Sequence, residues 1–226
     1  MQLTDKTMTV LENFSSIQSN LVVQTGNHLK TIAEARNIVA IAKLDQEFPT
    51  DFGIYELSEF LGVLGLVDTP TLTFDDEFLT VADSNGTSKV RYFYSPTDFL
   101  TSPKKDVNFP DVMVKFKLTK ATLEKVKRAS STLGHDKLVI EPNNGSITLT
   151  VTDPADETAN NFKVEVPADY EDGSDFSYVM NIGNLKMIPD DYDVSLPTKT
   201  ISKFESASGD IIYYTALDKT STYGGE

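Results

Sequence analysis

Two stretches of the chain share one order of residue types: QLTDKTMTVLENFSSIQSNLVVQTGN at residues 2–27 and KLTKATLEKVKRASSTLGHDKLVIEPNNG at residues 117–145. Each begins with Leu-Thr, continues with a helical pattern that contains Ser-Ser, and passes through an apolar strand into a turn. Thr4 and Thr119 stand at the N-cap of the two expected helices, where a threonine hydroxyl accepts a hydrogen bond from a free backbone N–H. The repeat indicates a chain built from two similar domains.

The correspondence continues further along both halves. Residues 37–64 parallel residues 161–188, and each stretch reads as a strand, an acidic loop, a second strand from Phe52 or Phe176, and a second helix. Further strands follow in both halves, recognised by alternating apolar and polar residues. Each half therefore predicts the order β-α-β-β-β-α-β-β-β, which makes the fold class α+β.

A segment without periodicity separates the two halves. Residues 95–111 hold three prolines, which is typical of an extended connector. We expect the domain boundary to lie inside it, which gives a first domain of residues 1–107 and a second domain of residues 108–226.

The composition restricts the classes of protein that the chain can be. Its 226 residues are 39% hydrophobic, contain no cysteine and carry a formal net charge of −14. The apolar fraction predicts a globular fold, and the absence of cysteine excludes disulfides and thiolate chemistry. No run of about 18 apolar residues marks a membrane span. The negative total disfavours a protein that binds nucleic acid by its overall charge.

Positive charge is nevertheless concentrated on one expected helix. At about 100° per residue, the helix from Lys120 turns its apolar residues to one side. These are Leu123, Val126, Ala129 and Leu133. The other side carries four bases and one acid, which are Lys120, Lys125, Lys127, Arg128 and Glu124. Such a face either meets phosphates without reading bases or is an ordinary solvated surface.

The helices expected in the first half lack this basic character. The first buries Val10, Leu11, Phe14 and Ile17, and the second buries Leu57, Phe60, Leu61 and Leu64. Gly62 and Gly65 weaken the second helix, so we expect another backbone to approach it closely there.

Several dispersed segments resemble the sliding clamps of T-even-type tailed bacteriophages. They are YELSEFLGVLGLV (55–67), NIGNLKMIPDDY (181–192), ENFSSIQSN (12–20) and SKFES (202–206). The resemblance implies a DNA clamp fold in which head-to-tail homotrimers form a ring, with helices lining the hole and β-sheets on the outside. It implies a protein without cofactor that tethers a DNA polymerase to encircled duplex DNA in the cytoplasm of the infected bacterial host. A clamp loader ATPase and phage late-transcription factors are further implied partners.

The resemblance also assigns candidate site residues. It implies that Lys120, Lys125, Lys127 and Arg128 face the DNA backbone, together with Lys186 on a short fourth helix. Family clamps capture polymerase peptides in an apolar pocket near the connector. The connector residues able to form one wall of that pocket are Phe99, Leu100, Phe109 and Pro110. The same four residues can instead simply hold the connector against the sheet.

The sequence offers no catalytic or metal-binding constellation. The acidic turns at 75–77 and 190–193 lack calcium-loop spacing, and His28 and His135 have no nucleophile beside them in a known motif. No phosphate-binding loop occurs, so we expect a separate loader to hydrolyse ATP. The alternatives are an acidic DNA mimic or interaction module, a virion structural protein, and an enzyme with an unrecognised site.

Overall fold

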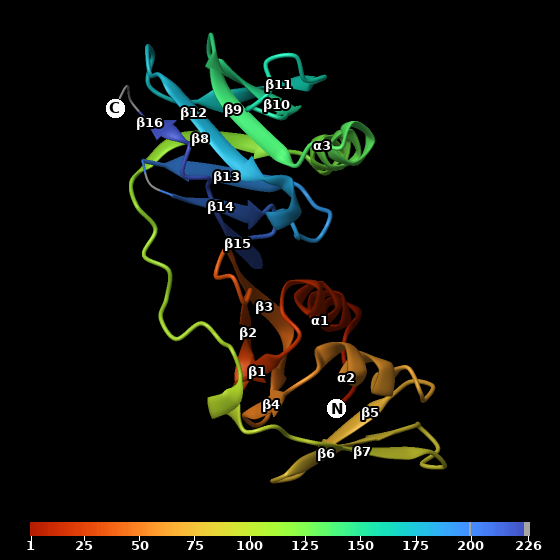
Figure 1. Ribbon diagram of the computed structural model, residues 1–226. Coiled ribbons are helices and arrows are strands. Elements are labelled where there is room, and N and C mark those ends of the chain that lie inside the picture. The colour runs from red at the N-terminus through yellow and green to blue at the C-terminus, as the bar shows by residue number, and fades with distance from the viewer. Residues whose placement is uncertain (199, 224–226) are drawn as a thin grey trace. The chain divides into compact units, whose positions relative to one another are not determined.

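The computed structural model describes residues 1–198 and 200–223 and divides into two units, Met1–Asp106 and Val107–Glu226. The predicted boundary between residues 107 and 108 lies one residue from this division. Figure 1 shows the chain coloured from the N-terminus to the C-terminus.

The first unit combines two helices with two antiparallel sheets. One sheet has the order β3-β2-β1-β4 and the other β5-β6-β7. Helix α1 packs on β2, β3 and α2. The elements are α1 (Asp5–Ile17), β1 (Leu21–Val23), β2 (Gly26–Ile32), β3 (Ile38–Phe48), β4 (Phe52–Ile54), α2 (Leu57–Leu64), β5 (Thr71–Phe74), β6 (Phe78–Ala82), β7 (Lys89–Phe93) and the 3₁₀ turn η1 (Thr97–Phe99).

The second unit places one long helix on a larger sheet. Its strands lie in the order β16-β12-β9-β10-β11-β8-β13-β14-β15, and α3 contacts β10, β11 and η2. The elements are β8 (Val112–Leu118), α3 (Lys120–Leu133), β9 (Lys137–Asn143), β10 (Ser146–Thr152), β11 (Phe162–Asp169), β12 (Phe176–Asn181), η2 (Ile182–Asn184), β13 (Tyr192–Pro197), β14 (Ile201–Ser206), β15 (Ile211–Ala216) and β16 (Thr222–Tyr223).

The two long helices begin by the same local device. The hydroxyl oxygens of Thr4 and Thr119 accept hydrogen bonds from the N–H groups of Thr7 (3.1 Å) and Thr122 (3.2 Å). Each cap satisfies a donor that the helix itself leaves unpaired. The repeat in the sequence therefore includes the threonine cap that begins each of the two long helices.

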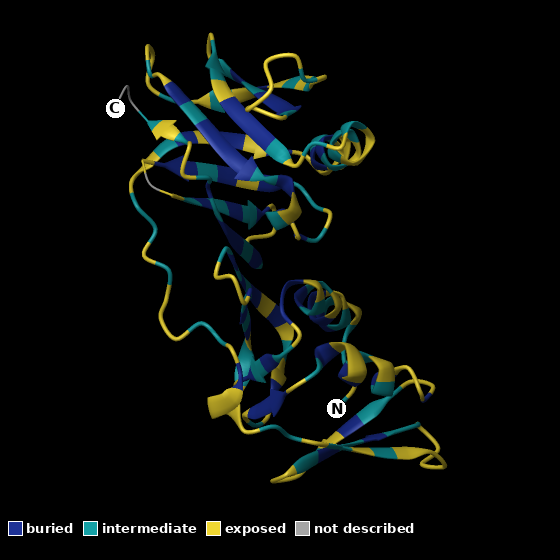
Figure 2. Ribbon diagram, viewed as in Figure 1, coloured by how far each residue is buried: buried dark blue, intermediate teal, exposed yellow. Residues whose placement is uncertain are grey.

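Burial follows the expected stripes, more fully in α1 than in α3. Val10, Leu11, Phe14 and Ile17 of α1 are all buried, as predicted. On α3 only Leu123 and Val126 are buried, whereas Ala129 and Leu133 remain partly exposed. Figure 2 shows the buried residues gathered on the sides of the helices that face the strands. The C-terminal end of the apolar stripe of α3 is therefore partly open to solvent.

The predicted order of elements was wrong in several places, and it did not include β16 at the end of the second half. Four strands, and not three, lie between the helices of each half. The described residues before α1 form no strand, whereas β8 precedes α3. The second helix of the second half is only the 3₁₀ turn η2, because Asn181 caps it with a 2.7 Å bond from the Gly183 N–H and the chain leaves the turn after Asn184.

The close backbone approach expected at Gly62 and Gly65 occurs instead at Gly53. A Cβ on Gly62 would meet nothing within 4 Å, and one on Gly65 would meet only carbonyl oxygens of its own helix. On Gly53 it would lie 2.2 Å from the Ser95 carbonyl oxygen and 2.7 Å from the Leu100 Cδ1 atom. The Ser95 N–H also donates to the Gly53 carbonyl at 2.9 Å. Glycine in β4 thus allows the start of the connector to lie against the first unit.

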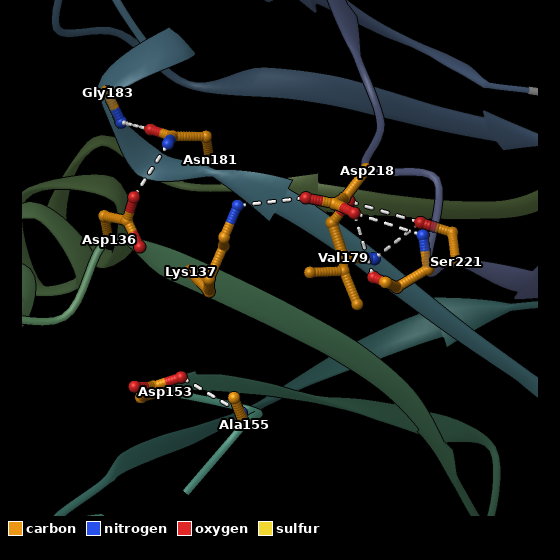
Figure 3. A network of polar contacts seen from close by, with 10 residues as sticks. Asp136, Lys137, Asp153, Ala155, Val179, Asn181, Gly183, Asp218 and Ser221 are labelled. Carbon is orange, nitrogen blue, oxygen red and sulfur yellow. Dashed lines mark hydrogen bonds and ion pairs between the residues drawn. The ribbon is translucent and has the colours of Figure 1, made fainter.

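A polar network fixes the C-terminal segment to the second unit (Figure 3). Lys137 on β9 donates to Asp218 at 2.9 Å, and both side chains are mostly buried. The Asp218 backbone N–H donates to the Val179 carbonyl at 2.7 Å, and the Val179 N–H donates to the Ser221 hydroxyl at 2.9 Å. The hydrogen bond from Lys137, with further ones from Thr220, lowers the pKa of Asp218 to about 2. These contacts hold the C-terminal segment, whose strand β16 pairs with β12, against the sheet.

Exchanging the two glycines for alanine tests the approach at β4. We expect Gly53→Ala to destabilise the chain by roughly 2 kcal/mol or more, because the new methyl group overlaps a backbone carbonyl. Gly62→Ala, the matched control, should stabilise it by up to about 1 kcal/mol, because that helix position is open. Urea unfolding measures both, and equal midpoints for the two variants would refute the assignment.

Replacing Asp218 tests the C-terminal network. A carboxyl with a lowered folded-state pKa stabilises the fold above its unfolded pKa and loses that contribution as the pH falls through the folded value. We expect Asp218→Asn to cost about 1 kcal/mol near neutral pH, after allowance for partial exposure, and less as the pH approaches about 2. Asp76→Asn, at an exposed turn, is the control for urea unfolding at each pH. A cost that does not change with pH would contradict the network.

Candidate nucleic-acid interface

Helix α3 presents a basic face that its packing holds in place. Leu123 and Val126 anchor it to the sheet, so the opposite side faces solvent. Lys120, Lys125 and Arg128 are exposed there, beside the acidic Glu124. The carboxylate of Asp191 accepts the backbone N–H of Lys120 at 2.8 Å, which fixes the first turn. The face can therefore offer cations to a polyanion from a rigid element.

Two of the five predicted DNA-facing residues are placed differently. Lys127 is half-buried, and burial lowers the pKa of its ammonium group. Lys186 is exposed but lies two residues beyond η2, and not on a helix as expected. Because η2 contacts α3, Lys186 belongs to the same region of the second unit. The structure therefore places Lys120, Lys125 and Arg128 together on the exposed face of α3. Lys186 follows η2 in the same part of the second unit.

The helices of the first unit carry the opposite charge. The exposed charged residues of α1 are Asp5 and Glu12, and that of α2 is Glu59. Positive charge is therefore a property of α3, and not a general property of the helices in this chain.

An apolar groove lies directly beside the basic face. It has a volume of about 450 Å³ and runs between the C-terminal half of α3 and the start of β11. Its lining residues are Lys125, Arg128, Ala129, Thr132, Leu133, Asn161 and Phe162. The two cations stand at a groove whose floor is mainly hydrocarbon, because Ala129 and Leu133 are left uncovered by the sheet.

The four connector residues predicted for peptide binding fall into two separate groups. Phe99 is 84% exposed on η1, whereas Leu100 is buried against Gly53 in the first unit. Phe109 belongs to the second unit, where its ring centroid lies 5.8 Å from that of Tyr214, and the half-buried Pro110 follows it. Neither unit by itself contains all four residues. Their joint role in one pocket remains a prediction.

Sequence reasoning did not identify the surface around β7. This strand forms the edge of its sheet, with Lys89, Arg91 and Phe93 pointing to solvent. Phe93 is 62% exposed and contacts Phe78, over whose ring the Arg91 guanidinium lies at 5.2 Å. Leu66, just after α2, is 69% exposed. The alternating residues of KVRYF are typical of a strand, but only the sheet order shows that this strand is an edge.

Other chemistry finds no support in the part of the chain that the structure describes. Residues 1–198 and 200–223 contain no group of three histidine, cysteine, aspartate or glutamate side chains placed to hold a metal ion. No helix among them is long and apolar enough to cross a membrane. His28 is exposed on β2 and His135 follows the end of α3, in different units.

Comparison with known proteins identifies the family. The family model described as gp45 sliding clamp, C terminal, matches residues 115–218. The sliding clamp of Vibrio phage KVP40 is 33% identical over 210 residues, which cover 90% of this chain and 94% of that protein. The chain belongs to the sliding-clamp family. The sliding clamp of Escherichia phage RB69 is 27% identical over 99% of both chains. The resemblance seen in the sequence is thus confirmed, and the protein is a DNA polymerase processivity clamp.

Solved structures confirm the clamp fold. The proliferating cellular nuclear antigen of Entamoeba histolytica superposes with a TM-score of 0.67 at 15% identity, over 93% of this chain and 94% of that one. That of Thermococcus kodakaraensis gives a TM-score of 0.70 at 12% identity, over 94% and 96%. At such low identity the likeness concerns the fold alone. The predicted α+β clamp architecture with two similar domains is therefore correct.

Proposed function

We propose that this clamp acts as a homotrimeric ring, with its subunits joined head to tail around duplex DNA, and that it tethers the replicative polymerase without catalysing any reaction. A separate ATP-driven loader opens and places the ring. Phage late-transcription factors are further partners, and the site of action is the cytoplasm of the infected bacterium. The observation that carries this proposal is the basic face of α3 in a chain of net charge −14.

The charge distribution fits a protein that holds DNA by enclosure. Lysine and arginine contacts to phosphates are independent of sequence and weaken steeply as salt is added. A ring that is retained by topology needs only such weak contacts, and weak contacts permit sliding. Lys120, Lys125 and Arg128 supply them from a fixed helix, and the acidic remainder of the chain repels DNA from other surfaces.

Ring closure is supported by two of the strand edges that the sheets of the described residues leave open, one in each unit. In the first unit, β7 ends the sheet β5-β6-β7. In the second, β11 pairs with β8 only at Ala168 and Asp169, so residues 162–167 have β10 on one side alone. Open edges invite pairing with another chain. One edge in each unit is what a head-to-tail contact requires, because the two surfaces of such a contact differ.

The surfaces next to these edges are complementary in character. In the first unit, the exposed Phe93 lies on β7 and the exposed Leu66 follows α2. The apolar groove that ends at Phe162 accompanies β11 in the second. Apolar side chains on one copy and an apolar groove on the next would bury each other. This contact repeats around a closed ring.

Capture of partners has support in a related fold. In one structure with a TM-score of 0.68 at 14% identity, the C-terminal region of FEN-1 is bound to the proliferating cellular nuclear antigen of A. fulgidus. For this chain we propose that the polymerase is captured by a peptide of its own near the connector. Phe99, which is the most exposed large apolar side chain there, is available to such a partner.

Charge reversal on α3 tests the DNA contact. We expect Lys120→Glu, Lys125→Glu and Arg128→Glu together to lower processive synthesis at moderate salt by roughly tenfold, because each cation lost removes counterion release. The matched control reverses the exposed lysines Lys43, Lys104 and Lys219, which changes the net charge equally. The length of the products made from a single primer at moderate salt is the measurement, and equal product lengths for both variants would refute the DNA-facing assignment.

Charges placed at the apolar edge test the ring. Light scattering of the wild-type chain should give a mass near three times 25.0 kDa. We expect Leu66→Asp and Phe93→Asp to give monomers on dilution, because a buried unpaired carboxylate costs several kcal/mol. Phe99→Asp, at a still more exposed aromatic outside the edge, should leave the mass unchanged. A wild-type chain that stays monomeric with and without DNA would favour the acidic DNA-mimic alternative.

A further inference from the structure

Helices α1 and α3 hold the same place in the two units. The four strands after each helix lie in the order β3-β2-β1-β4 in the first unit and β11-β10-β9-β12 in the second, which is the same order when the strands are counted from the helix. Helix α1 contacts the second and third of its strands, β2 and β3, and α3 contacts the second and third of its own, β10 and β11. The two helices are therefore equivalent elements of one repeated unit.

Equivalent positions of the two helices carry different charges. When the helices are aligned at their threonine caps, three positions that hold a base in α3 hold an acid or an amide in α1. The aligned pairs are Asp5 with Lys120, Glu12 with Lys127, and Asn13 with Arg128. Asp5 and Glu12 are exposed, whereas the one base of α1, Lys6, is only partly exposed. The repeat has thus kept the helix and reversed the charge of its polar side.

The exposed hydroxyl groups of α1 donate their hydrogens within the helix. The Thr9 hydroxyl donates to the Asp5 carbonyl at 2.9 Å, and the Ser16 hydroxyl donates to the Asn13 carbonyl at 2.6 Å. Each hydroxyl has only one hydrogen to donate. A phosphate close to this side of α1 would therefore meet carboxylates and hydroxyl groups whose hydrogens already have acceptors.

We propose that α1 keeps the DNA backbone at a distance, so that the long helices that contact phosphates are the α3 helices alone. Asp5 and Glu12 are the positioning residues for this role. The inference rests on the proposed function, in which the basic face of α3 meets the DNA. Because equivalent elements of a repeated unit take equivalent places in a head-to-tail ring, the polar sides of α1 and α3 both face the encircled duplex.

The alternation of acidic and basic helices limits how strongly the ring holds DNA. Each cation that neutralises a phosphate strengthens binding and makes it more sensitive to salt. If both long helices of every subunit were basic, more of these contacts would have to break whenever the ring moves. Acids on α1 reduce the number of simultaneous contacts, and the ring therefore slides more freely along the duplex.

Lysines placed on α1 test this role. The double variant Asp5→Lys and Glu12→Lys gives α1 the charges that α3 carries at the aligned positions. We expect the loaded ring to diffuse along a duplex tethered at both ends roughly tenfold more slowly than the wild type at low salt, because new phosphate contacts must break as it moves. The difference should shrink as salt is added, since salt screens these contacts. Single-molecule tracking of the labelled clamp measures the diffusion coefficient.

A control pair and a second variant separate this role from other effects of the charges. Asp76→Lys and Glu77→Lys together make the same change of charge on the exposed turn after β5, and this pair should diffuse like the wild type. Asp5 lies in the first turn of α1, where an acid stabilises a helix. Glu12→Lys alone avoids that loss, and it should keep the wild-type urea midpoint while slowing diffusion roughly threefold.

Failure of this inference can be distinguished from failure of the proposed function. If the chain forms no ring around DNA, the wild-type clamp itself is not retained on the tethered duplex. If the wild type is retained but both α1 variants diffuse as fast as it does, the role of α1 is overturned and the ring stands. Slowing by the control pair that equals the slowing by the α1 pair would also overturn it, because the effect would then belong to the net charge of the chain.

Discussion

Burial of one stripe of each long helix on an antiparallel sheet determines the direction of everything else on that helix. In α3 the stripe is short, since only Leu123 and Val126 are fully covered. That burial is enough to turn Lys120, Lys125 and Arg128 to solvent, and it leaves the C-terminal part of the helix beside an open groove. The exposure of the three cations and the partial exposure of Ala129 and Leu133 therefore have one cause, which is the part of α3 that the sheet covers.

Strand edges are the second constraint on this fold. An antiparallel sheet must end somewhere, and an unpaired backbone edge is either shielded or used. The chain shields the edge at β4 with the connector, where Gly53 lets Ser95 approach. Among the residues that the structure describes, the open edges include β7 and the first part of β11. The proposed ring contact uses this property.

Much of this architecture could be read from the chain. The threonine caps, the buried stripe of α1 and the division near residue 107 follow from local sequence, because caps and helical periodicity depend on neighbours within a few residues. The errors have a common cause. The fourth strand of each half, the reduction of the last helix to η2, and the close approach at Gly53 all depend on residues distant in the chain. Gly53 and Gly62 are the same residue type, and nothing local distinguishes them.

The sequence by itself determined the duplicated α+β organisation, the concentration of basic residues between Lys120 and Arg128, and the resemblance to phage sliding clamps, since each depends on the order of residues along the chain. Only the tertiary structure decided which strands are edges, that Lys127 is half-buried while Lys125 and Arg128 are exposed, and that Phe99 is exposed while Leu100 is buried. The physical reason is that exposure and pairing are properties of what lies opposite a residue. Those neighbouring residues come from distant parts of the chain, so the local sequence pattern cannot identify them.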